Sequence, residues 1–214
     1  MDPFSARAVR QAYDEVAADY VVAFGDDLDR LPLDRELLDL ALASATGDGY
    51  VLEAGCGPAP AACHYGERVP DLVGIDLSAA MLALARARRS MMVTAQADLR
   101  QLPLCDDACR LAIAFYSLQH MPRPDLGLAL SELHRVLAAD GRLLMAMHLG
   151  DGDVETSVFL GHEIDAVGGA LYERDELVRR VLAAGFHVEL ERQRGPLPHE
   201  HDTQRLYLLA RPGR

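Results

Sequence analysis

The stretch VLEAGCGPAP, residues 51–60, constrains the fold of this chain more than any other. Its apolar beginning is typical of the end of a buried strand, and Gly55 and Gly57 then allow a tight turn with no side chain to obstruct a ligand. Two prolines limit how the chain leaves this turn, and the apolar residues 59–69 predict a helix. Because the first N–H groups of a helix have no partner within it, we expect them to face a ligand above the strand.

Carboxylates are expected at the ends of three successive strands. The dinucleotide-binding pattern GxGxxG fails here, because Pro60 stands at its third glycine. The strand DLVGID nevertheless ends in Asp76, 21 residues after Gly55, where a carboxylate can accept hydrogen bonds from ribose hydroxyls. Glu53 ends the first strand, and Asp98 stands where the unit MMVTAQADL should end. In a parallel sheet these ends share one edge, which favours a nucleoside site over the alternative of solvated loop carboxylates.

Length and charge narrow the class of protein. A chain of 214 residues suits one domain with a sizeable core. A formal net charge of −12 and a pI near 5.0 would repel nucleic acid. With no recognisable leader and no apolar run long enough to cross a bilayer, we expect a soluble, cytoplasmic protein. The four cysteines lack metal-ligand spacing, so no metal is predicted, and Cys56 is expected to add backbone and bulk near the ligand.

The first 46 residues predict two helices ahead of the sheet. Apolar and aromatic positions in 5–23 fit one helical face, and Asp34 is expected to cap a second helix. Tyr13 and Tyr20 are amphipathic and suited to closing over a bound ligand. Simple padding of the sheet is the alternative, and the sequence leaves both open.

Helices and strands alternate after the glycine turn. Ser78 is expected to cap a helix at 78–89, and residues 110–117 predict a fourth buried strand. The segment LQHMPRP predicts an irregular connection, followed by an amphipathic helix at 125–138 and a fifth strand at 142–148.

The C-terminal third has a different character. Residues 150–169 are rich in Gly and Asp, too irregular for one long element and too long for a plain connector, so we expect a pocket-shaping segment. A helix at 173–184 should end at Gly185 and lead into a strand at 186–192. The linker GPLPHEHD then precedes a last strand at 205–210.

Six motifs in the correct order resemble those of the class I S-adenosylmethionine-dependent methyltransferases, particularly the small single-domain group that acts on small molecules. LEAGCG resembles the glycine-rich first motif, GIDLS the ribose-binding strand end, and QADLRQLPL the segment whose Asp meets the adenine amine. AFYSLQHMP is similar to the fourth-strand motif, and LHRVLAADGRLLM to the helix and strand after it. YERDELVRRVLAAGFHVE and RLYLLAR resemble the closing helix and antiparallel hairpin.

This resemblance implies a fold and a division of the chain. The fold class is α/β, a Rossmann-like, doubly wound, seven-stranded sheet that is mostly parallel and has a C-terminal antiparallel hairpin strand. Residues 1–214 form one methyltransferase domain. Within it we expect an N-terminal helical cap at 1–46, a cofactor-binding core at 47–149, and a third part at 150–214 that holds the pocket-forming segment, the last helix and the hairpin.

The resemblance also assigns residues to the cofactor S-adenosylmethionine. Gly55 and Gly57 flank its methionine portion, Asp76 holds the ribose, and Asp98 with Leu99 meets the adenine. Glu53 acts indirectly, through the turn and the methionine ammonium group. The N-terminal tyrosines help to cover the cofactor. The full predicted cofactor set is Tyr13, Tyr20, Glu53, Gly55, Cys56, Gly57, Asp76, Leu77, Met81, Asp98, Leu99, Tyr116 and Ser117, in which Met81 packs on the purine or, as the usual alternative, is ordinary core.

Histidines are the candidate catalytic residues. If the acceptor is a phenol, alcohol or protonated amine, a general base assists the reaction, and histidine titrates in the useful range. His120 follows the fourth strand on an irregular turn, where the methyl group should lie, although a ring hydrogen-bonded to backbone is an equal alternative. His148, at the end of the fifth strand, is the second candidate. His199 and His201 beside Glu200 suggest metal or substrate binding, but an exposed polar linker is the favoured interpretation.

The predicted function is therefore transfer of a methyl group from S-adenosylmethionine to an O or N atom of a small-molecule acceptor, by in-line displacement that leaves S-adenosylhomocysteine. One rival is a catalytically silent protein that binds the cofactor as a sensor or partner subunit. The other rival is a nicotinamide-dependent oxidoreductase, which would need the third glycine of GxGxxG and a second mononucleotide-binding half. Beyond the acceptor, neither nucleic acid nor membrane is expected as a partner, and a homodimer is left open.

Overall fold

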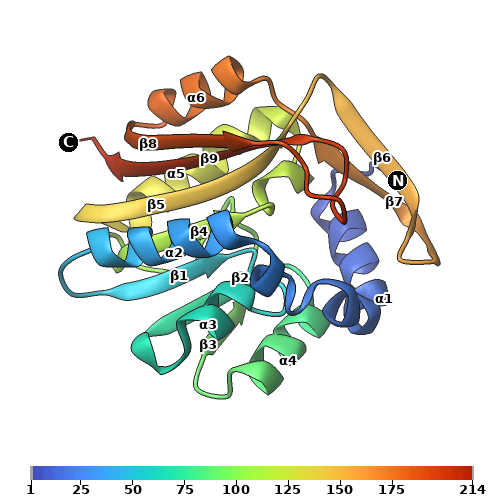
Figure 1. Cartoon of the computed structure of the whole chain (residues 1–214), viewed down its shortest axis with the longest axis horizontal. Coiled ribbons are helices and arrows are strands. Elements are labelled where there is room, and N and C mark those ends of the chain that lie inside the picture. The colour runs from blue at the N-terminus through green and yellow to red at the C-terminus, as the bar shows by residue number, and fades with distance from the viewer. Residues whose placement is uncertain (1, 214) are drawn as a thin grey trace.

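A seven-stranded sheet forms the centre of the molecule (Figure 1). The structure is a computed structural model that describes residues 2–213, apart from the side chain of Asp27. The strands follow the order β3-β2-β1-β4-β5-β9-β8, and all neighbours are parallel except that β9 runs antiparallel to β5 and β8. Their bounds are β1 (Tyr50–Ala54), β2 (Leu72–Asp76), β3 (Val93–Gln96), β4 (Cys109–Phe115), β5 (Leu137–Leu149), β8 (Phe186–Arg194) and β9 (Gln204–Pro212). The predicted fold class is confirmed.

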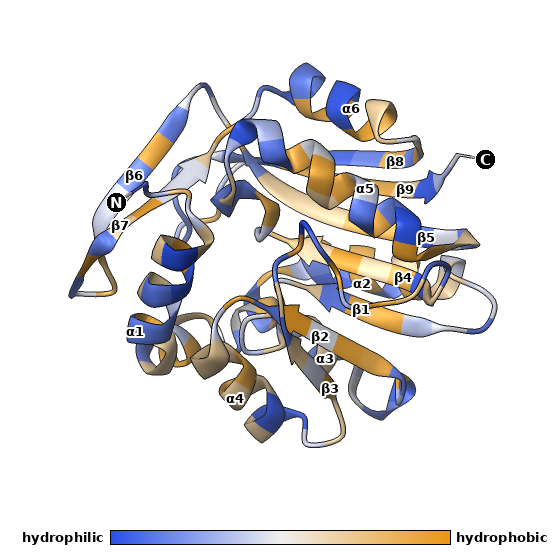
Figure 2. Ribbon diagram, turned by 180° about the vertical axis from the view of Figure 1, so that it is seen from behind, coloured by the Kyte–Doolittle hydropathy of each residue, from blue (hydrophilic) through white to orange (hydrophobic). Residues whose placement is uncertain are grey.

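Helices cover both faces of this sheet because its central strands are apolar on both sides, as the orange ribbons of Figure 2 show. Apolar residues of α2, α3 and α4 pack on one face, and those of α5 and α6 on the other. The helices are α1 (Ala6–Phe24), α2 (Pro32–Ser44), α3 (Pro60–Tyr65), α4 (Ala79–Arg88), α5 (Leu126–Val136) and α6 (Arg174–Ala183), with short 3-10 turns at Asp27–Arg30, Gly66–Arg68, Leu118–His120 and Arg123–Asp125.

The chain reverses its direction of travel across the sheet at β1. Strands β2 and β3 lie on one side of β1, while β4 and β5 lie on the other. In open α/β sheets, such a switch point opens a crevice at the carboxyl ends of the strands. Asp76 is in register with Gln96, so the ends of β2 and β3 lie together at this edge, as predicted.

The segment at 150–169 is not irregular, and that prediction was wrong. It forms a hairpin of β6 (Asp153–Phe159) and β7 (His162–Ala170), a separate two-stranded sheet beside α1 (Figure 1). Its turn is Leu160 and Gly161, with φ of +52° and +83°. A two-residue hairpin turn commonly has two positive φ values. Leucine is unusual at the first of these positions, so the sequence did not indicate a turn here.

Two helix boundaries also differ from prediction. Helix α2 begins at Pro32 rather than after an Asp34 cap, and Asp34 lies in its first turn, fully buried. Helix α3 ends at Tyr65, because Gly66 takes a φ of +57° that a continuing helix does not allow. By contrast, Ser78 caps α4 as expected, with its hydroxyl accepting from the Met81 N–H at 3.0 Å.

Candidate functional site

The glycine turn after β1 joins the ends of two neighbouring strands. Gly55 has a φ of +69°, and a Cβ built on it would lie 2.2 Å from the Cβ of Ser117. The Ser117 hydroxyl donates to the Ala54 carbonyl at 2.8 Å, which ties the segment after β4 to the end of β1. Gly57 has a φ of +49° and would meet no atom within 4 Å with an added Cβ. The first glycine is therefore required by packing, while the second faces open space.

Glu53 takes the helix N–H groups that we expected to face a ligand, so that expectation was wrong. Its carboxylate accepts from Ala61 N–H at 3.0 Å and from Ala62 N–H at 3.1 Å, at the start of α3. Burial raises the pKa of Glu53 to about 7, and these two hydrogen bonds only partly oppose the shift. Glu53 thus holds the start of α3 against the end of β1, and its indirect role toward the methionine ammonium group stays a prediction.

Two predicted residues point into the protein interior instead of into the crevice. The Cys56 thiol packs beside Gly74 of β2, and burial raises its pKa well above the usual range. Only the backbone of Cys56 remains available near a ligand. The prediction that its side chain adds bulk there was wrong. Met81 is 1% exposed, which agrees with the ordinary-core alternative stated for it.

Asp76 connects the glycine turn to the start of α4. One carboxylate oxygen accepts from the Gly57 N–H and the other from the Ser78 N–H, both at 2.8 Å. Burial raises the pKa of Asp76 above its ordinary value, although these N–H groups favour the charged form. Each carboxylate oxygen has a second lone pair. The carboxylate is therefore held in place and retains acceptor capacity for hydroxyl groups.

A hollow of about 320 Å³ opens at the carboxyl ends of β2 and β3, lined by Leu77, the residue after Asp76, but not by Asp76 itself. Its walls come from two distant parts of the chain and consist of Ala6, Arg7, Arg10, Leu77, Gln96, Ala97 and Asp98. Tyr13 and Tyr20 were the residues expected from α1, and the lining by Ala6, Arg7 and Arg10 was not foreseen, because helical spacing in residues 5–23 does not show which face meets the sheet edge. The neighbouring Leu99 is 6% exposed and belongs to the core, so it lies behind this wall.

Asp98 is already engaged by a neighbouring cation. The Arg100 side chain donates to both carboxylate oxygens, from Nε at 2.9 Å and from Nη2 at 2.6 Å. Burial alone would raise the pKa of Asp98, but these hydrogen bonds outweigh it and hold the pKa below its usual range. Asp98 thus lines the hollow as an anion paired with Arg100. The sequence pattern did not indicate this pairing.

Helix α1 and the β6–β7 hairpin meet over the crevice. The rings of Tyr13 and Tyr20 lie 5.9 Å apart, and each contacts Phe159 of β6 at about 6 Å. Asp14 binds α1 to the start of α4, because its carboxylate accepts from the Ser78 hydroxyl at 2.6 Å. The two tyrosines therefore pack where α1 meets the hairpin, and their role as a cover for the cofactor stays a prediction.

Both ring nitrogens of His120 are occupied. Its Nδ1 lies 2.9 Å from the Gly168 carbonyl of β7, which can only accept, so Nδ1 carries the proton. Its Nε2 then accepts from the Tyr13 hydroxyl at 2.8 Å. Burial lowers the pKa of His120 below its ordinary value. This geometry favours the alternative in which His120 is a structural ring bonded to backbone.

His148 differs from His120 because only one of its nitrogens has a hydrogen-bond partner among the described residues. Its Nδ1 lies 2.7 Å from the Thr203 Oγ1, and its ring packs against that of Tyr116 at a tilt of 36°, with centroids 4.9 Å apart. Burial, followed by the charge of Arg205, lowers the pKa of His148 to about 4. His148 is therefore a neutral imidazole with a free Nε2 at the carboxyl end of β5.

The linker at 195–202 is not wholly exposed. His199, His201 and Asp202 face solvent as expected, but the Glu200 side chain is only 9% exposed and pairs with Arg194. Within residues 2–213, no group of His, Cys, Asp and Glu is arranged to hold a metal ion. Over the same range, no helix has the length and apolar character needed to span a bilayer.

Comparisons with known proteins agree with this geometry. Residues 51–141 match a family described as methyltransferase domain. A malonyl-[acyl-carrier protein] O-methyltransferase of Pseudescherichia vulneris is 32% identical over 143 residues, which cover 66% of this chain and 53% of that protein. Residues 51–141 are therefore similar to methyltransferase domains, and the chain resembles the S-adenosylmethionine-dependent methyltransferases. The cofactor of this family is S-adenosylmethionine.

Solved structures extend the likeness beyond the matched segment. The DhpI–SAH complex gives a TM-score of 0.73 at 20% identity and covers 97% of both chains. The [4+2]-cyclase SpnF gives a TM-score of 0.70 at 19% identity and covers 98% of this chain and 97% of its own. At these identities the structures show a common fold. The chain spans about half the length of the curated relatives it matches, so their acceptors do not transfer directly.

Proposed function

We propose that this protein transfers the methyl group of S-adenosylmethionine to an O or N atom of a small-molecule acceptor. The observation that carries the proposal is the hollow at the carboxyl ends of β2 and β3, which Leu77 and Asp98 line within the stretch 51–141 that matches a methyltransferase domain. A polar wall with one held carboxylate and apolar side chains suits a nucleoside. The unpaired cysteines further favour a reducing compartment, so we include the cytoplasm in the proposal.

The proposal orients the cofactor along the edge of the sheet. Adenine occupies the hollow between Leu77 and Asp98, and the ribose hydroxyls donate to Asp76. The methionine portion follows the turn at Gly55 and Gly57, where no side chain blocks it. This direction carries the sulfonium from β2 toward the ends of β4 and β5, where the acceptor meets the methyl group.

The reaction itself needs little covalent help from the protein. The bond from sulfur to the methyl carbon breaks as a bond from the acceptor atom to that carbon forms, and neutral S-adenosylhomocysteine leaves. Holding the acceptor lone pair in line with the breaking bond, and keeping water away, supplies most of the catalysis. For a protonated acceptor, His148 Nε2 is the base we propose, because the equivalent lone pair of His120 is taken by Tyr13.

The acceptor class is a finer part of the proposal. The curated relatives are named as O-methyltransferases of malonyl-[acyl-carrier protein], which favours oxygen over nitrogen. A mass-shift screen should therefore include a malonyl thioester with and without its carrier protein, together with phenols, alcohols and amines. Methylation of amines alone would contradict the oxygen preference.

Calorimetric titration with S-adenosylmethionine tests the binding step. The wild-type protein should bind, and Asp76→Asn should weaken binding about ten- to hundredfold, because charge-assisted hydrogen bonds to the ribose are lost. Asp71→Asn is the matched control, since Asp71 precedes the same strand at its opposite end, where it pairs with Arg110. Equal affinities of wild type and Asp76→Asn would remove Asp76 from the site. Binding without methylation of any acceptor would instead favour the silent binder.

A further inference from the structure

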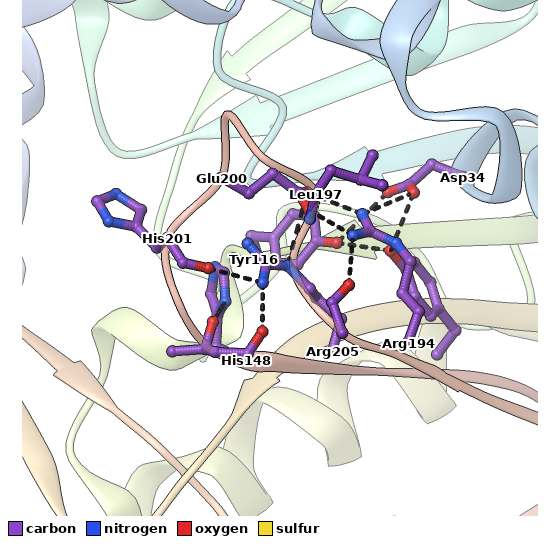
Figure 3. A network of polar contacts seen from close by, with 11 residues as sticks. Asp34, Tyr116, His148, Arg194, Leu197, Glu200, His201 and Arg205 are labelled. Carbon is purple, nitrogen blue, oxygen red and sulfur yellow. Dashed lines mark hydrogen bonds and ion pairs between the residues drawn. The ribbon is translucent and has the colours of Figure 1, made fainter.

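The loop between β8 and β9, residues 195–203, lies against the imidazole of His148. Figure 3 shows that His148 and this loop belong to one polar network. His148 of β5 is in register with Arg205 of β9, so Thr203 lies just beyond the paired strands, next to the histidine ring. Its hydroxyl oxygen is 2.7 Å from His148 Nδ1.

Two arginines hold the path of this loop. Arg194 donates to both oxygens of Glu200, and Glu200 in turn accepts from the Leu197 N–H at 2.7 Å. Arg205 is 2% exposed and donates to the carbonyls of His201, at 2.8 Å, and of Thr203. Buried charged groups that bind loop carbonyls fix the backbone, so Thr203 is held by contacts on both of its sides.

The imidazole ring of His148 also packs against Tyr116, a residue with a strained backbone conformation. Tyr116 has a φ of +56°, a conformation that costs a non-glycine residue about 1 kcal/mol or more and that clusters at functional sites. Its hydroxyl lies 2.9 Å from that of Tyr207, which donates to the buried Asp34 at 2.9 Å. The tilted ring of Tyr116 and the Thr203 hydroxyl therefore leave His148 little freedom to rotate.

The charged groups around His148 favour the neutral ring. The groups whose charges act on it are Arg205, His201, His120 and Glu200, and only Glu200 opposes the others. A neutral imidazole carries one proton, and its place is decided by the partner of Nδ1. If the Thr203 oxygen accepts a hydrogen bond from Nδ1–H, the lone pair resides on Nε2; if the Thr203 hydroxyl donates to Nδ1, Nε2 carries the proton and is not a base.

We propose that Thr203 is a positioning residue for His148, whose Nδ1–H donates to the Thr203 hydroxyl oxygen, so that the Nε2 lone pair is directed to the methyl acceptor. This inference rests on the proposed methyl transfer. It goes further by assigning the loop 195–203 the task of setting the tautomer and the orientation of the base. During transfer, the acceptor proton passes to Nε2 and the imidazole becomes a cation, which returns the proton to solvent after the product leaves.

Nuclear magnetic resonance of protein labelled with ¹⁵N at histidine tests the tautomer without cofactor or acceptor. His148→Gln assigns the signal of this residue. In the wild type and in Thr203→Ser, Nδ1 should show the shift of a protonated nitrogen and Nε2 that of an unprotonated one near neutral pH. Thr203→Val should lose this preference and move the two shifts toward each other. A wild-type ring protonated on Nε2 would overturn the proposal, whatever the variants do.

Kinetics with an acceptor found in the screen provide the second test. Thr203→Val should lower kcat at least tenfold with little change in the KM for S-adenosylmethionine, and Thr203→Ser should restore most of the rate. Thr46→Val is the control, because Thr46 is exposed and lies between α2 and β1. Equal kcat values for Thr203→Val and the wild type would refute the positioning role. Failure of the wild type to methylate any acceptor would instead count against the proposed function and leave the tautomer result intact.

Discussion

The buried carboxylate of Glu53 should make the stability of this protein fall as pH rises. Glu53 is 5% exposed, and its pKa rises from an ordinary 4.5 to about 7 on folding. Between these two pH values the native protein binds more protons at this site than the unfolded chain does. Stability therefore decreases as pH rises through this window, and the loss is complete above about pH 7.

The magnitude follows from the difference between the two pKa values. At 1.36 kcal/mol for each pH unit, the shift from 4.5 to about 7 corresponds to about 3 kcal/mol of unfolding free energy. The variant Glu53→Gln cannot ionise, but it keeps the shape and one acceptor oxygen. Any cost of placing its NH₂ group near the Ala61 or Ala62 N–H is independent of pH, so that cost displaces the stability curve without changing its slope.

Urea unfolding at a series of pH values across this window is the assay. Relative to Glu53→Gln, the wild type should lose about 3 kcal/mol between pH 4.5 and pH 7. Glu36→Gln serves as the control, because Glu36 is exposed on α2. If the curves of the wild type and Glu53→Gln run parallel, the N–H groups of α3 compensate burial fully and the reasoning fails.

Two further substitutions test the packing of the site. Gly55→Ala should cost on the order of 3 kcal/mol, because its Cβ would meet Ser117 at 2.2 Å and its φ is +69°, whereas Gly57→Ala, with φ of +49° and open space, should cost only about 1 kcal/mol. Equal losses in urea unfolding would show that the Ser117 contact relaxes. Asp34→Ala removes a carboxylate 3.2 Å from Arg194 in a buried network and should cost about 3 kcal/mol in the same assay, while a loss below about 1 kcal/mol would mean that Glu200 alone satisfies the arginine.

The sequence was most informative where a signal is local. The glycine turn, the Ser78 cap and the acidic strand ends each depend on a few adjacent residues, and the structure brings Asp76 and Asp98 to one edge as predicted. Buried strands such as β4 were predicted correctly, because a short continuous apolar run is typical of a strand that is covered on both faces.

The missed features depend on partners that are distant in the chain. Asp34 was predicted to be a helix cap. Its partner Arg194 lies 160 residues later in the chain, and no local sequence pattern predicts such a pair. Glu200 looked like an exposed linker residue for the same reason. The hollow is partly lined by Arg7 and Arg10, and their place over β3 follows from how α1 docks rather than from its helical spacing.

The hairpin that covers the crevice has a closed base. The Leu171 N–H donates to the Gly152 carbonyl at 3.0 Å, and the guanidinium of Arg123 donates to the Gly152 and Leu171 carbonyls. The segment between these two residues lies outside the matched stretch 51–141, and its ends sit next to each other. Because the base is closed by these bonds, we expect an insertion at the tip, between Leu160 and Gly161, to leave the strand ends of the seven-stranded sheet in place.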